Sequence, residues 1–324
     1  MRSRLNKTLR KYLPPILMLC GIGLFLLLIK GKASQVDIDV LQESIINNPI
    51  LFTSALLLLF PNWVIEAHKW FQLLRQHVSI DAFTACKSVL AGIGLSIFTP
   101  NRIGDFGGRV LFVQKQDRPT AFYITFICSS AQLLITIVVG SFGLLYFISQ
   151  LQDFLIIKAV PTVAVLVLAT DMILVILFMK IERLRRIHKW LFPKMRHRIE
   201  QFPQVSALEK IKVLFWSFLR YLLFTIQFFI IMRLLGSDIA ALDSFFALSL
   251  VYLFTSFLPT SIITEVPIRG SVAFFLSSAL QLQAEMAAMA FVAMWIINLF
   301  IPAVFSLLLL KEMKTLKIWK PKPA

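Results

Sequence analysis

Two acidic residues each precede an arginine by four positions within otherwise apolar sequence. The pairs are Asp105 with Arg109 and Glu265 with Arg269. Residues four apart lie on one face of a helix, so each acid can pair with its arginine. A guanidinium group presents a planar fork of N–H donors that matches the oxygens of a phosphate. The two pairs therefore predict a site that binds a phosphate or a similar oxyanion.

Turn-forming residues surround both pairs and predict a helix that restarts next to each acid. The free N–H groups and the positive dipole end of such a half-helix can hold an anion, and glycines let a headgroup approach the backbone. We therefore predict substrate-binding residues Pro100, Asn101, Arg102, Gly104, Asp105, Gly107, Gly108 and Arg109 in the first segment, and Pro259, Glu265 and Arg269 in the second. The alternative is that both acids only cap their half-helices, while the arginines pair with them or snorkel to the interface.

The composition is that of a membrane protein. Of the 324 residues, 58% are hydrophobic and only 15% are charged, against about 25% charged in soluble domains. The formal net charge of +16 resides in clusters between apolar segments, which argues against nucleic-acid binding. The three cysteines form no CxxC motif and the histidines have no paired spacing, so we expect no metal and no other cofactor.

Six apolar runs are long enough to cross a bilayer within one integral membrane domain, 1–324. They lie at about 12–29, 49–68, 120–148, 154–179, 213–235 and 285–310, each close to or above the roughly 20 residues that a spanning helix needs. Two further apolar regions, 82–113 and 243–282, are interrupted by the Pro-containing and charged segments described above. These two regions require a different interpretation.

The distribution of cations predicts how the broken regions run. The loop 180–212 contains ten Lys or Arg residues against three Glu, which places it in the cytoplasm together with the basic N- and C-termini. If 82–113 crossed the membrane once, this loop would emerge outside. We therefore expect 82–113 to enter the membrane and return to the same face, and 243–282 to do so from the opposite face.

An internal repeat agrees with this topology. The units, about 49–150 and 213–310, carry matched features in the same order, including Ile80-Asp81-Ala82-Phe83 and Leu242-Asp243-Ser244-Phe245. Inverted repeats around broken helices are typical of secondary transporters. The predicted fold is thus an all-α polytopic membrane protein with about six full transmembrane helices and two oppositely oriented re-entrant helical hairpins.

Other polar residues inside the spans carry secondary predictions. Asp171 is a candidate for proton or ion coupling, or for a pair with Arg220; hydrogen bonding between helices is the alternative. We expect hydrogen bonds between helices from Gln132, Gln227 and Asn298. An interfacial belt at the cytoplasmic end of the second span is expected from Glu66, His68, Lys69 and Trp70. Segment 181–212 fits either an amphipathic helix on anionic lipid or a solvated basic loop.

With Pro100, Gly104-Asp105 and Arg109, the chain resembles the lysylphosphatidylglycerol synthase transmembrane region, also called the flippase-like or UPF0104 family, over nearly its whole length. The family's second copy has a Gly-rich turn and Gly-x-x-Glu, where this chain has Ile262-Ile263-Thr264-Glu265-Val266-Pro267. The resemblance implies a multi-pass protein of a bacterial or archaeal cytoplasmic (inner) membrane that moves lipids or lipid-linked groups. Full-length synthases carry a cytosolic aminoacyl-transfer domain after this region. The chain ends 14 residues past Leu310, so the synthase reaction is not expected.

The main functional hypothesis is a lipid translocase for an anionic phospholipid or a polyprenyl-phosphate-linked lipid. No nucleophile with a neighbouring base and no nucleotide-binding loop occurs in the sequence, so we do not expect an enzyme. Two alternatives remain open. The chain is a non-catalytic membrane subunit that serves a separate glycosyl- or aminoacyl-transferase, or it is an intramembrane lipid-modifying enzyme that uses Asp105 or Glu265 as acid or base.

Overall fold

The computed structural model describes residues 38–96, 99, 102–150, 154–183, 202–258, 262–277 and 283–306, and every regular element in these ranges is helical. The prediction of an all-α protein is therefore confirmed. Several predicted features lie outside the described residues: the first span at 12–29, Pro100, Asn101, Pro259 and 184–201 of the basic loop.

Five helical stretches are long and apolar enough to cross a membrane among the described residues. They are Pro49–Leu74, Lys115–Ser149, Val160–Met179, Ala207–Leu234 and Glu285–Ser306. At 1.5 Å per residue, 20 or more helical residues reach the roughly 30 Å of a hydrocarbon core. These stretches correspond to five of the six predicted spans, and the multi-pass membrane class is confirmed.

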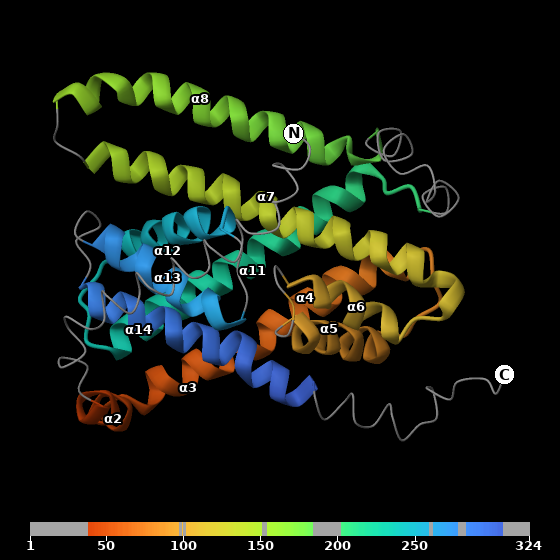
Figure 1. The fold of residues 1–324 in the computed structure, drawn as a ribbon, viewed down its shortest axis with the longest axis horizontal. Helices are drawn as coiled ribbons and strands as arrows, with labels where there is room; N and C mark the ends of the chain where they lie inside the picture. Colours follow the sequence, from red (N-terminus) through yellow and green to blue (C-terminus); the bar gives the residue numbers. More distant parts are fainter. Residues whose placement is uncertain are drawn as a thin grey trace, which may run out of the picture. The chain divides into compact units, whose positions relative to one another are not determined.

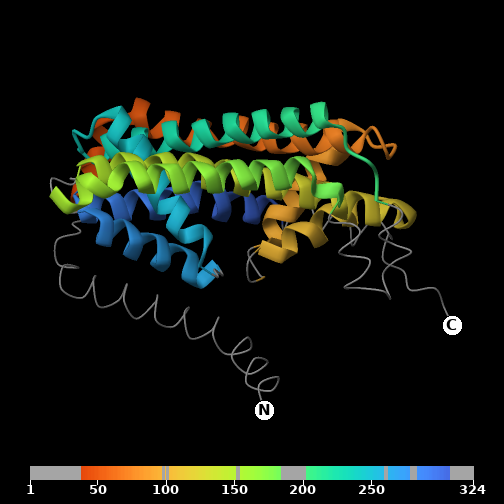
Figure 2. The ribbon, with the colours of Figure 1, turned by 90° about the horizontal axis from the view of Figure 1, so that it is seen from above.

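The spans are built from the long helices in Figures 1 and 2. After α2 (Ile38–Asn47), the predicted second span combines α3 (Pro49–Leu57) and α4 (Leu59–Leu74). The next three spans are α7 (Arg118–Gln150), α8 (Phe154–Met179) and α11 (Ala207–Leu234). The last span runs from α14 (Ala284–Trp295) into the π-helical turn η6 (Ile296–Phe300). Apolar residues of α8 such as Val165, Met172 and Ile173 are exposed. Exposed apolar side chains on a spanning helix are suited to contact with lipid tails.

Two pairs of shorter helices occupy the broken regions. The first is α5 (Ala82–Ser96) with α6 (Ile103–Leu111), and the second is α12 (Ala241–Ser256) with α13 (Ile262–Ser277). In each pair the two helices contact one another (Figure 1). The 15 residues of α5 reach only about 22 Å, less than a hydrocarbon core. Helical hairpins are therefore present, while their re-entry into the membrane stays a prediction.

Local side-chain contacts explain where the hairpin helices begin. Asp81 accepts hydrogen bonds from the Thr84 main-chain N–H at 2.9 Å and from the Thr84 hydroxyl at 2.6 Å, which caps α5. These bonds also lower the pKa of Asp81 below its ordinary value. Arg102, in the link before α6, has a left-handed φ of 55°, which is unusual for a residue with a side chain. In α12, Asp243 of the first turn accepts a hydrogen bond from the Tyr146 hydroxyl at 2.5 Å.

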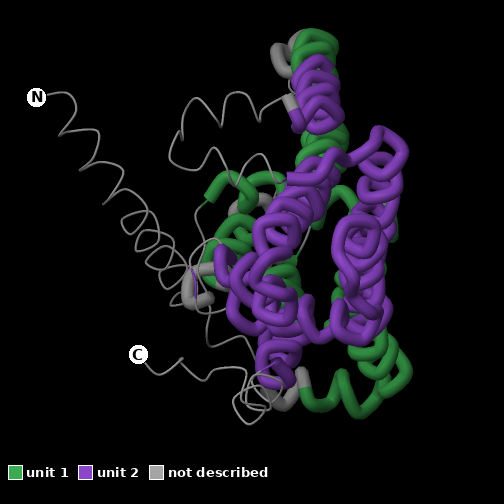
Figure 3. Tube along the Cα trace, turned by 90° about the vertical axis from the view of Figure 1, so that its right-hand side faces the viewer, with its two compact units in different colours: residues 1–58, 136–168, 224–295 green, residues 59–135, 169–223, 296–324 purple. Residues whose placement is uncertain are grey.

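The chain groups into two compact units, coloured in Figure 3. Unit 1 takes its described residues from 1–58, 136–168 and 224–295, and its buried core includes Phe228, Leu248 and Phe291. Unit 2 takes its described residues from 59–135, 169–223 and 296–324, and its buried core includes Trp70, Leu74, Ile124 and Ile127. The first hairpin belongs to unit 2 and the second to unit 1.

Within unit 2, polar contacts fix the start of α11 against the end of α8. The Ser206 main-chain N–H donates to Glu209 Oε2 at 2.6 Å, and the Glu209 main-chain N–H donates to Ser206 Oγ at 3.3 Å, which is a capping box. Lys210 Nζ then donates to the Met179 carbonyl at 2.8 Å and to Glu182 Oε2 at 2.7 Å. These contacts hold both ends of the basic loop.

Candidate anion-binding site

Glycines bring the two helices of the first hairpin into close contact. A Cβ atom on Gly108 would lie 2.5 Å from the Gly92 Cα, and one on Gly104 would lie 2.8 Å from Thr99 Oγ1 and would also collide with the Leu95 carbonyl. α5 and the residues that follow it thus fill the space on the Cβ side of Gly104 and Gly108, and the predicted contact of these glycines with a headgroup stays a prediction. Gly107 has nothing within 4 Å of its Cβ position and retains an open face.

The close packing buries Arg109 beside its predicted partner. Arg109 Nε donates to Asp105 Oδ1 at 2.8 Å, so the ion pair expected from their spacing is formed. Only 4% of the Arg109 side chain is exposed, against 17% of the Asp105 side chain. Arg109 Nη2 donates to Glu66 Oε1 of α4, also at 2.8 Å. Arg109 therefore connects the first hairpin to α4.

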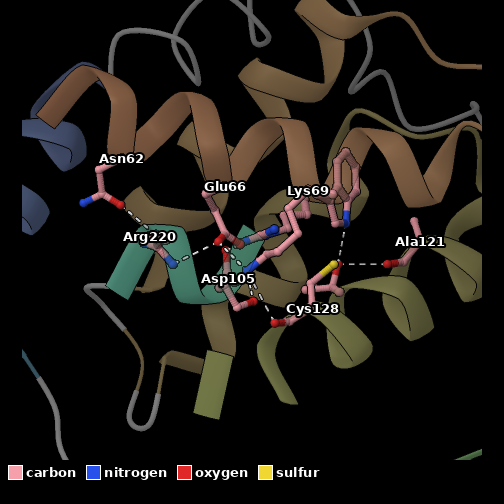
Figure 4. A network of polar contacts seen from close by, with 11 residues as sticks. Asn62, Glu66, Lys69, Asp105, Ala121, Cys128 and Arg220 are labelled. Carbon is pink, nitrogen blue, oxygen red and sulfur yellow. Dashed lines mark hydrogen bonds and ion pairs between the residues drawn. The ribbon is translucent and has the colours of Figure 1, made fainter. Parts of the chain in front are cut away.

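Glu66 is the centre of the site (Figure 4). Besides Arg109, its carboxylate contacts Lys69 Nζ at 2.8 Å and Arg220 Nη1 of α11 at 2.9 Å, both through Oε2. Glu66, Lys69 and Trp70 are all buried. The expected interfacial belt is thus wrong for these three residues, because the face of α4 that carries them packs against α6, α7 and α11. We call Glu66, Lys69, Asp105, Arg109 and Arg220 the Glu66 cluster.

Neutral polar groups position the cations of the cluster. Arg220 Nε donates to Asn62 Oδ1 at 2.6 Å, and Asn62 Nδ2 donates to Asn298 Oδ1 of η6 at 2.9 Å. Lys69 Nζ lies 3.3 Å from Ser217 Oγ and 3.5 Å from the Cys128 carbonyl oxygen, its two hydrogen-bond acceptors outside the carboxylate. π-helical turns commonly occur at functional positions. The one at Ile296–Phe300 supplies the residue that orients Asn62.

The Glu66 cluster has an excess of positive charge. Its side chains are three cations and two carboxylates, joined by four ion pairs of 2.8–2.9 Å. Among the described residues, Arg109 Nη1 is buried and has no hydrogen-bond partner. A buried donor without a partner and a buried uncompensated charge are both costly. An oxyanion bound at Arg109 would remove both costs.

A comparison with known protein families identifies the class of membrane protein. The model of the lysylphosphatidylglycerol synthase TM region matches residues 16–306. The chain belongs to this family. Neither a curated protein nor a solved structure matches the chain. Membership places the chain among membrane proteins of lipid modification or transport.

The other predicted site residues of this family member lie in several places. Arg102 precedes α6 and its side chain is exposed. Arg269 lies in α13 of unit 1, with its guanidinium 5.0 Å from the centroid of the Tyr252 ring. Glu265 lies in α13, but its side chain is outside the described residues, as are Pro100, Asn101 and Pro259.

Several secondary predictions can also be placed. Gln132 donates to the Ser217 carbonyl at 3.3 Å, Gln227 donates to the Ala55 carbonyl at 2.8 Å, and Asn298 accepts from Asn62, so all three form the expected hydrogen bonds between helices. Asp171 is buried in α8; its pairing with Arg220 and its role in coupling stay predictions. The described residues contain no group of His, Cys, Asp or Glu that could hold a metal ion.

Sequence reasoning missed Glu66, Lys69 and Arg220 as site residues. Their signal is the position of ionisable side chains inside apolar helices, since such residues in spans are commonly functional. Glu66 and Lys69 lie one turn apart within Pro49–Leu74, and Arg220 lies near the middle of Ala207–Leu234. The hydrophobic profile gave their depth, but it did not indicate that the face of α4 with Glu66 and Lys69 meets the face of α11 with Arg220.

Proposed function

We propose that this protein is a translocase that moves a lipid with an anionic phosphate headgroup across the cytoplasmic membrane, and that the Glu66 cluster binds the phosphate. The observation that supports this most is the buried excess of positive charge around Arg109 Nη1. A phosphate in hydrocarbon lacks the hydrogen bonds that water gives it, which costs several kcal/mol or more. Arginine donors inside the protein replace those bonds.

The two carboxylates have different roles in this proposal. Glu66 contacts three cations and only 5% of its side chain is exposed, whereas Asp105 is paired with Arg109 and is 17% exposed. Displacing Asp105 breaks one ion pair, while displacing Glu66 breaks three. Asp105 therefore holds Arg109 when the site is empty and yields Arg109 Nε to the arriving phosphate. Nη1, which has no hydrogen-bond partner among the described residues, lies on the opposite edge of the guanidinium from the Nε–H and offers a further donor to the headgroup.

The test is translocation of fluorescent phosphatidylglycerol in proteoliposomes that contain the full-length protein. Arg109→Gln removes the fork and the charge, and we expect it to reduce the initial rate to the protein-free background. Arg109→Lys keeps the charge without the fork and should retain only part of the rate. Arg75→Gln is the matched control, because Arg75 is exposed at the end of α4 and lies over the Phe71 ring.

A normal rate for folded Arg109→Gln would contradict the proposal. Mass spectrometry of the lipids recovered from the same proteoliposomes separates transport from chemistry. A translocase returns the lipids unchanged, and a lipid-modifying enzyme returns a product of altered mass. Because this assay contains no other protein, transport in it would also argue against a subunit that acts only together with a separate glycosyl- or aminoacyl-transferase.

A further inference from the structure

We infer that the Glu66 cluster selects lipids by headgroup charge, accepting a headgroup with a phosphate and no amine and rejecting a headgroup with several ammonium groups. This inference rests on the proposed function, since it names the class of lipid for the same site. It bears directly on the family, whose name refers to lysylphosphatidylglycerol. That lipid carries two amines and one phosphate, and so has a net positive headgroup at neutral pH.

The balance of charges within the site favours an anionic headgroup. The cluster has one more cation than it has carboxylates: Lys69, Arg109 and Arg220 against Glu66 and Asp105. The Lys69 side chain is fully buried, and each of the other four side chains is at most 17% exposed. A site made for a polycationic headgroup needs surplus carboxylates instead.

The site also has few acceptors for an ammonium group. Both oxygens of Glu66 are already occupied by Lys69, Arg109 and Arg220. Asp105 accepts from Arg109, and the proposed phosphate takes its place there. Once the phosphate is bound, the released Asp105 is the single cluster carboxylate left for an amine. A lysyl headgroup has two amines, so at least one would stay uncompensated beside three cations.

The expected size of the selectivity follows from Coulomb's law. Consider a unit charge on the headgroup at about 8 Å from the excess positive charge of the Glu66 cluster, with an effective dielectric constant of about 20. Their interaction changes the affinity of the site for the lipid by more than tenfold. The anionic and the lysyl headgroups differ by two units of charge. We therefore expect at least tenfold preferential retention of phosphatidylglycerol over lysylphosphatidylglycerol.

The experiment is native mass spectrometry of the full-length protein released from phosphatidylcholine nanodiscs that contain equal mole fractions of the two lipids. High ionic strength screens the surface potential of the bilayer, so the retained ratio reports the buried site. Wild type and Arg75→Gln should retain phosphatidylglycerol at least tenfold more often than lysylphosphatidylglycerol. In Arg109→Gln the ratio should fall towards that of the nanodisc. In Asp105→Asn, which adds a positive charge, the ratio should increase further.

The outcomes separate the inference from the proposed function. If wild type retains both lipids equally while Arg109→Gln still abolishes translocation, charge selection is wrong and the translocase proposal stands. If neither retention nor translocation depends on Arg109, both are wrong. Inorganic phosphate provides the third arm. We expect it to leave the retained phosphatidylglycerol in place, and displacement of the lipid by phosphate would identify a free anion as the ligand and overturn the inference.

Discussion

Replacing Gly108 by alanine tests whether the contact between α5 and α6 positions the site. A Cβ at this position would lie 2.5 Å from both Cα and N of Gly92 and 2.6 Å from the Ala91 carbonyl carbon. All three neighbours are main-chain atoms, so no side-chain rotation can relieve the overlap. The helices must separate by about 0.9 Å to reach the 3.4 Å of ordinary contact.

That separation has a calculable cost. Overpacking of this kind typically destabilises a protein by about 1–3 kcal/mol. Moving α6 also moves the adjacent Arg109 relative to Glu66 of α4, and their 2.8 Å ion pair lengthens. We therefore expect Gly108→Ala to lower the free energy of unfolding by about 2 kcal/mol and to slow lipid translocation.

The neighbouring Gly107 provides a matched control for stability. Gly107→Ala makes the same change on the same helix, but the new Cβ would meet nothing within 4 Å. This variant should leave the free energy of unfolding unchanged or raise it by about 0.5–1 kcal/mol. The assay is thermal unfolding of both variants in one detergent, with the proteoliposome rate measured on the folded fraction. Equal stability of the two variants would refute the packing argument.

Three further predictions use the same unfolding measurement. Glu66→Gln leaves three buried cations without their common carboxylate and should cost about 3–5 kcal/mol, whereas the exposed Glu43→Gln should change stability by less than about 0.5 kcal/mol; equal effects would remove Glu66 from its central role. Trp70→Phe loses the 2.9 Å bond from Nε1 to Thr125 Oγ1 and should cost about 1 kcal/mol, and an unchanged midpoint would argue against that bond. Ser206→Ala removes half of the capping box of α11 and should cost about 1 kcal/mol, a loss that Ser206→Asp should avoid.

The spans could be predicted from the sequence because lipid leaves the backbone few alternatives. A chain segment in hydrocarbon must satisfy its own N–H and C=O groups, so a sufficiently long apolar run is a helix. The pair Asp105–Arg109 was likewise predictable, since a spacing of four on one helix is a local relation. Both inferences needed only residues that are close in the sequence.

The centre of the site could not be predicted in this way. Glu66 and Arg220 are 154 positions apart, and their contact depends on which faces of α4 and α11 meet. Ionisable residues near a helix end fit an interfacial belt equally well until that packing is known. Gly107 and Gly108 are indistinguishable as sequence letters, but one is exposed and the other contacts α5.

In the proposed function, the Arg109 guanidinium contacts a lipid phosphate inside the protein. Dipolar recoupling between arginine ¹⁵N and lipid ³¹P, measured on full-length protein in phosphatidylglycerol bilayers, tests this contact directly. We predict a short-range coupling in wild type and in Arg75→Gln that is reduced in Arg109→Gln. The same coupling in wild type and Arg109→Gln would contradict it.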